Sequence, residues 1–143
     1  MEILIVIAII GILIAISVTV FKRFNSLERI SKDAELVVEV IRQARSRTVA
    51  SEGAQVYGVH FESGSVTLFT GSTYSAGALD NQVYLLTVPN TISTITLSGG
   101  GSDVLFARLT GEATKNGTIT LTSPQTPRTK VVTIYKTGLV ESN

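Results

Sequence analysis

The sequence predicts an α+β fold in which one long N-terminal helix packs against antiparallel β-sheets. Up to Glu52 the chain has no proline and one glycine, Gly11, and its apolar residues take helical spacing after Lys22. Beyond Gly53, short segments rich in Val, Ile, Thr and Tyr alternate with turn residues, as in short strands. Because an amphipathic helix and a sheet each need a partner to cover one face, we predict one shared core.

The composition excludes several classes of function. The net charge of +1 lacks the basic excess of a typical nucleic-acid-binding protein. With no cysteine and one histidine, the chain cannot form disulfides, a thiolate nucleophile or a typical zinc site. No G-x-S-x-G spacing positions a serine nucleophile. The sequence therefore predicts a non-enzymatic protein without a cofactor or a metal ion.

The first segment is uncharged from Ile3 to Phe21. As a helix it would span about 28 Å, close to the hydrocarbon thickness of a bilayer. A cleaved signal peptide would need a basic start and a small-residue cleavage site, and a buried helix is rarely apolar on every face. We therefore predict a transmembrane helix over residues 1–23. Residues 24–143 would hold the second, amphipathic half of the helix and the β domain.

The amphipathic half has one apolar face, and its charged residues lie mostly elsewhere. Glu28 and Lys32 are spaced to pair along the helix, and Gly53 is expected to end it. The apolar face comprises Phe24, Leu27, Ile30, Ala34, Val37, Val38, Ile41, Ala44 and Thr48.

Eight short strands are expected after the helix. Asn116-Gly117 predicts a type I′ hairpin turn, and Glu62–Ser65 predicts a second tight turn. His60 falls on the opposite strand face from Tyr57 and Phe61, where a surface or loop-covered histidine is expected. The predicted strands are Gln55–Glu62, Ser65–Phe69, Val83–Val88, Ile92–Leu97, Val104–Leu109, Thr118–Thr122, Lys130–Tyr135 and Leu139–Glu141.

The residues MEILIVIAIIGILIAI resemble the N-terminal segment of type IV pilins and pseudopilins, with Glu2 at that family's near-invariant glutamate. The resemblance implies that prepilin peptidase processes a full-length precursor and that the new N-terminus is methylated. In that family the mature chain would begin a few residues before the position of Met1. It also implies that Glu2 pairs with the α-amino group of a neighbouring subunit. The helix that serves first lipid and then the filament core would include Ile3, Ile5, Ile9, Gly11, Leu13, Ile16 and Phe21.

Later residues resemble the GspH/FimT group of minor pseudopilins and minor pilins. They are Ala44-Arg45-Ser46, Phe106 ahead of Gly111, the segment Asn116–Leu121 read as a hairpin, and Val131–Val140 with Thr137-Gly138. The resemblance implies a structural subunit of a type II secretion pseudopilus or a type IV pilus, at or near its tip. Its partners would be other pilins or pseudopilins and the inner-membrane assembly platform.

The orientation in the membrane rests on the resemblance. Lys22, Arg23 and Arg29 follow the span, and the positive-inside rule alone would leave the β domain in the cytoplasm. The family's basic leader implies the opposite: a single-pass inner-membrane protein with an exported C-terminal domain, which becomes part of a periplasmic or cell-surface filament.

The alternative function is a DNA- or substrate-binding pilus subunit, used in DNA uptake or adhesion. DNA-uptake members of the group cluster basic residues around a C-terminal glycine, whereas Gly138 here has Lys136 on one side and Glu141 on the other. A solvated hairpin explains this region without a ligand, and few phosphate contacts would give weak binding at physiological salt. Nucleic acid is therefore not an expected partner. A weak nucleic-acid face would have to come from Arg108, Lys115, Arg128 and Lys130.

Overall fold

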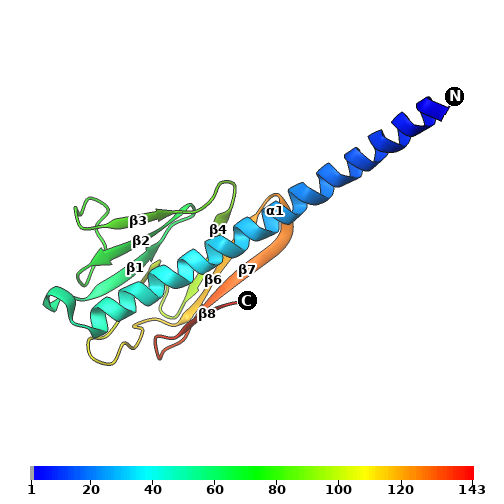
Figure 1. Ribbon diagram of the computed structural model, residues 1–143. Coiled ribbons are helices and arrows are strands. Elements are labelled where there is room, and N and C mark those ends of the chain that lie inside the picture. The colour runs from blue at the N-terminus through cyan, green and yellow to red at the C-terminus, as the bar shows by residue number, and fades with distance from the viewer. Residues whose placement is uncertain (1) are drawn as a thin grey trace.

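The computed structural model describes the backbone of residues 2–143 and the side chains of residues 3–14 and 25–143. Its first element is a single helix, α1 (Glu2–Val49), whose N-terminal half projects from the domain while its C-terminal half lies along the sheets (Figure 1). The predicted long helix is confirmed, but it ends before Gly53. Ser51 takes a left-handed φ of 53°, and a 3₁₀ turn, η1 (Glu52–Ala54), reverses the chain.

The predicted apolar face of α1 is confirmed from Ile30 to Thr48. Leu27 is half-buried, and the side chain of Phe24 lies outside the described residues. Val40 and Asp33 are buried as well, which was not predicted. The expected pair on the exposed side forms, with 2.9 Å between Lys32 Nζ and Glu28 Oε1.

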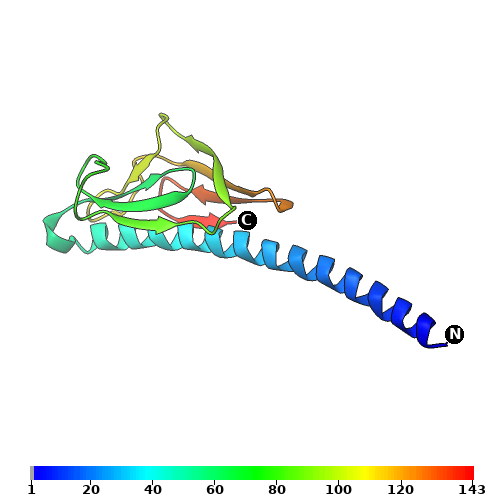
Figure 2. The same ribbon diagram turned by 90° about the horizontal axis from the view of Figure 1, so that it is seen from above.

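Eight strands form two antiparallel four-stranded sheets. One sheet has the order β3-β2-β1-β5, and the other has the order β4-β6-β7-β8. Figure 2 shows both sheets on the same side of α1, so that the helix covers the core they share. The strands are β1 (Tyr57–Phe61), β2 (Ser65–Thr70), β3 (Gln82–Leu85), β4 (Thr91–Leu97), β5 (Asp103–Leu105), β6 (Gly117–Ser123), β7 (Thr126–Ile134) and β8 (Val140–Ser142).

All eight predicted strands exist, but two of them end three or four residues early. The strand predicted over Val83–Val88 stops at Leu85, because the backbone N–H of Thr87 turns to the carboxylate of Asp33 on the helix. The strand predicted over Val104–Leu109 stops at Leu105, because the next residues form a loop in which Leu109 has a φ of 71°.

The predicted type I′ turn at Asn116-Gly117 is wrong. Gly117 begins β6 and lies between Leu97 of β4 and Ile134 of β7. The β4 backbone comes so close that a Cβ on Gly117 would stand 1.9 Å from the carbonyl oxygen of Thr96. Position 117 therefore requires glycine because the β4 backbone approaches so closely, and not because the residue lies in a turn.

The second predicted turn is confirmed. Glu62 N–H donates to the Ser65 carbonyl at 3.0 Å, which closes the turn between β1 and β2. The hairpin that was missed joins β6 to β7, where Ser123 pairs with Thr126 across two intervening residues.

Candidate functional site

The first half of α1 presents an apolar rod, Ile3–Ile14, that packs on neither sheet (Figure 1). Its large apolar side chains are between 50% and 75% exposed, on every side of the helix. Of the residues predicted for this segment, Ile3, Ile5, Ile9 and Leu13 are exposed, and a Cβ on Gly11 would meet nothing within 4 Å. An apolar surface this extensive marks a contact with a partner or with lipid.

The other residues predicted for this segment, Glu2, Ile16 and Phe21, have side chains outside the described residues. In the part of the chain that the structure describes, no helix has the length and apolar character needed to cross a membrane.

At the other end of α1, Arg45 brings together two turns that are distant in sequence. Its Nε donates to the carbonyl oxygen of Gly111 at 3.0 Å. Gly111 and Gly138 both have left-handed φ angles, 69° and 78°, and both are buried against the arginine. A Cβ on Gly138 would lie 1.9 Å from the Gly111 carbonyl oxygen and 2.7 Å from Arg45 Nε. Only glycine fits at these positions, because the guanidinium packs directly on the backbone.

Three separate motifs of the predicted resemblance therefore meet at Arg45. Ala44-Arg45-Ser46 lies on the helix, Gly111 follows β5, and Gly138 precedes β8. The sequence identified the motifs but not their meeting point, which depends on contacts between residues at least 66 positions apart. The signal available in the sequence was an arginine directly after the apolar-face residue Ala44, together with two isolated glycines.

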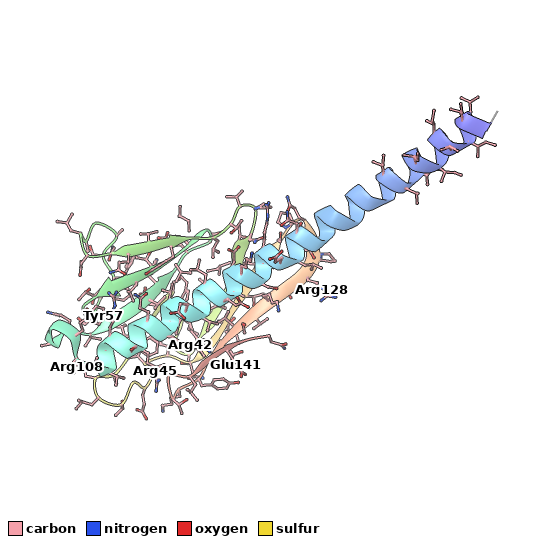
Figure 3. All side chains as sticks on the ribbon, viewed as in Figure 1. Arg42, Arg45, Tyr57, Arg108, Arg128 and Glu141 are labelled. Carbon is pink, nitrogen blue, oxygen red and sulfur yellow. The ribbon has the colours of Figure 1, made fainter. Side chains whose placement is uncertain are left out.

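Beside this contact lies a groove of about 520 Å³, which we name the Arg45 groove. Figure 3 shows Arg42 and Arg45 on the same part of α1, near Glu141 of β8. Arg42 Nη2 reaches the carbonyl oxygen of Val140 at 3.4 Å. The groove is lined by Arg42, Arg45, Ser46, Val49, Ala50, Thr110, Gly138, Leu139 and Val140.

A second polar contact holds the packed half of α1 nearer its start. Asp33, only 3% exposed, accepts hydrogen bonds from Thr87 Oγ1 at 2.9 Å and from Asn90 Nδ2 at 2.6 Å. The backbone N–H of Thr87 also donates to this carboxylate, at 3.2 Å. These bonds tie the helix to the loop between β3 and β4, so the carboxylate has a structural role.

His60 is the loop-covered strand histidine that the sequence predicted. Tyr57 and Phe61 are buried on the core face, while His60 is half-buried on the other face. The ring of Tyr74 stacks on the imidazole with centroids 3.8 Å apart, and Nδ1 lies 2.5 Å from Asp103 Oδ1. Among the residues with described side chains, no three His, Asp or Glu residues are placed to share a metal ion.

The four cations considered as a weak nucleic-acid face are not gathered together. Arg108 and Arg128 lie at opposite ends of the β domain (Figure 3). Lys115 Nζ donates to the Gly100 carbonyl oxygen at 2.7 Å, and Lys130 belongs to β7, opposite Leu121. Their separation leaves no continuous basic surface made of these four residues.

Comparison with known proteins supports the resemblance. The family model for the type II transport protein GspH matches residues 33–138, which include α1 from Asp33 onward and every strand from β1 to β7. Neither a curated protein nor a solved structure matches the chain significantly. Proteins of the GspH family are structural, non-enzymatic pseudopilins of type II secretion, which associate with other pseudopilins and are anchored in the inner membrane. Because the match covers most of its length, the chain belongs to the GspH family of type II transport proteins.

Proposed function

We propose that this chain is a minor pseudopilin, a structural subunit of the type II secretion pseudopilus. Residues 1–23 would hold it in the inner membrane, with the β domain exported, until it enters the filament. The single observation that supports this most is the apolar rod Ile3–Ile14, which leaves the domain with its side chains exposed.

The rod has the properties needed in two successive environments. Each Å² of apolar surface removed from water contributes about 25 cal/mol, so the exposed rod strongly favours a lipid or protein partner. Lipid tails and neighbouring helices are similarly apolar, so exchange between them is driven mainly by packing and polar contacts. The subunit can therefore leave the membrane for a bundle of pseudopilin helices at little net cost.

Glu2 supplies the polar contact in this proposal. A carboxylate at the start of an apolar segment costs roughly 2–3 kcal/mol when it is placed in a bilayer. Pairing with the α-amino group of a neighbouring subunit would offset that cost and would set the axial register of the two helices. The remaining assignments follow from the GspH/FimT resemblance: processing by prepilin peptidase, contact with the assembly platform, and a place at or near the tip.

The test compares two Glu-to-Ala substitutions on the same helix. Glu2→Ala should leave membrane insertion unchanged but lower co-purification with pseudopilus filaments about tenfold or more, since breaking a buried ion pair costs about 3–5 kcal/mol. Glu35→Ala is the matched control, because Glu35 is exposed on the packed half of α1. Incorporation of Glu2→Ala at the level of the control would contradict the assembly role of Glu2. A wild-type chain absent from both the membranes and the filaments would contradict the proposed function.

A further inference from the structure

The Arg45 groove contains two arginines whose charges are not neutralised within the described part of the chain. No carboxylate there forms an ion pair with Arg42 or Arg45; the ion pairs present involve Lys32, Arg47 and His60. Each of the two arginines donates one hydrogen bond, and in both cases the acceptor is a backbone carbonyl oxygen. A guanidinium has five N–H donors, so most donors in the groove are left for an external acceptor.

The carboxylates of the neighbouring hollow form no ion pair with either arginine. Glu35, Glu39 and Glu141 line a second hollow, which Arg42 also lines. The Tyr135 hydroxyl donates to Glu141 Oε1 and engages that carboxylate. Among the residues with described side chains, neither arginine of the groove therefore forms an ion pair with an acid.

Arg45 is also held in place before any ligand arrives. It is half-buried, its Nε is bonded to Gly111, and Gly138 packs against it. A side chain fixed in this way loses little conformational entropy on binding, which favours affinity. Arginine binds carboxylates through two parallel N–H···O bonds, so a fixed guanidinium also selects for that geometry.

The rim of the groove resembles a protein interface. Leu139 is 59% exposed and stands beside the exposed Val49, while Ser46 and Thr110 contribute hydroxyl groups. Apolar side chains around an arginine are typical of the energetically important centre of a protein–protein contact. A nucleic-acid site would extend the positive charge along a phosphate track, whereas Arg128 lies at the far end of the domain from the groove and the groove's rim includes the exposed Leu139.

We propose that the Arg45 groove binds an acidic segment of a neighbouring pseudopilin, with an Asp or Glu carboxylate between Arg42 and Arg45 and an apolar side chain against Leu139. This proposal rests on the proposed function, because it takes the occupant from the same filament. It adds a contact made by the β domain, separate from the contact made by the apolar rod.

The first experiment measures recovery of the other pseudopilins of the secretion system with the full-length chain from detergent-solubilised membranes. Arg42→Glu and Ser46→Glu each place a carboxylate in the groove, at exposed positions that the fold tolerates. Each should lower recovery about tenfold or more, because a repulsion replaces the attraction between the groove and its ligand. Arg128→Glu makes the same charge change as Arg42→Glu at the opposite end of the domain and should leave recovery unchanged.

The outcomes separate the two proposals. If both groove variants recover the other pseudopilins at the wild-type level, the groove proposal is overturned and the proposed function still stands. Failure of the wild-type chain to recover any pseudopilin would overturn the proposed function, and the groove proposal with it. As a control, each variant should unfold at the same temperature as the wild-type chain. Loss of a partner is then not caused by loss of the fold.

A second experiment identifies the chemistry of the occupant. Arg42→Lys introduces an amine, which a carbodiimide couples to a carboxylate in contact with it. We expect a cross-link between this variant and an Asp or Glu of another pseudopilin, above the level given by Arg128→Lys. No excess over that control would overturn the proposal. Binding of a short DNA duplex that Arg42→Glu abolishes would overturn it in favour of a phosphate-binding site.

Discussion

Replacing Asp33 by alanine should lower the free energy of unfolding by about 2 to 3 kcal/mol, because a hydrogen bond to a charged group is worth about 1.5–3 kcal/mol. Three donors lose their acceptor: the N–H and hydroxyl of Thr87 and the side-chain amide of Asn90. Thr87 is exposed, so water can replace the carboxylate there. Asn90 is only 4% exposed, so its amide is left without a partner, and this group accounts for most of the cost.

The assay is urea unfolding of the full-length chain in a mild detergent, followed by the circular dichroism of the β domain. The slope of the free energy against urea should be unchanged, since the same surface is exposed on unfolding. Glu35→Ala, at an exposed site on the same helix, should stay within about 0.5 kcal/mol of wild type. The double variant Asp33→Ala, Asn90→Ala should be less destabilised than the sum of the two single changes, because both remove the same bond. A loss below about 1 kcal/mol for Asp33→Ala would refute the assignment of Asp33 as a structural acceptor.

Two further predictions concern the contacts near β8. Gly138→Ala should lower the free energy of unfolding by about 2 kcal/mol or more, because a left-handed φ costs about 1–2 kcal/mol and the new Cβ meets the Gly111 carbonyl. Gly64→Ala, where a Cβ meets nothing within 4 Å, should change it little, and equal effects of the two substitutions in urea unfolding would disprove the contact. The hydrogen bond from the Tyr135 hydroxyl to Glu141 raises the pKa of Tyr135 above 10.0. Its stabilising contribution is therefore complete below pH 10.0 and is lost as the pH rises through the raised value; Glu141→Gln should bring the tyrosinate absorbance transition back toward pH 10.0.

Local patterns in the sequence predicted most of the secondary structure. The helix follows from uninterrupted helical spacing, and the strands follow from short β-branched runs between turn residues. Asn116-Gly117 was misread because its role depends on β4 and β7, whose positions the local sequence does not contain. An Asn-Gly pair is a strong turn signal only when the flanking segments pair with each other.

The helical spacing of the apolar residues could also have predicted that Asp33 is buried. It lies three positions after Ile30 and four before Val37, so it falls on the same helical stripe as these buried residues. A carboxylate on a buried stripe requires hydrogen-bond partners, which predicts donors in the covering sheet. The identity of those donors, Thr87 and Asn90, could not be predicted, because they lie more than 50 positions away.

The two polar contacts of α1 together determine how far the rod extends from the domain. An apolar stripe packed on a sheet can shift along the helix axis with only a modest loss of stabilising free energy, because apolar contacts are not directional. Asp33 near the start of the packed half and Arg45 near its end each have acceptors or donors at only one register. A shift of one helical turn, about 5.4 Å, would break both sets of bonds at once. How far the rod extends from the β domain is therefore determined by the polar residues of the packed half rather than by the rod itself.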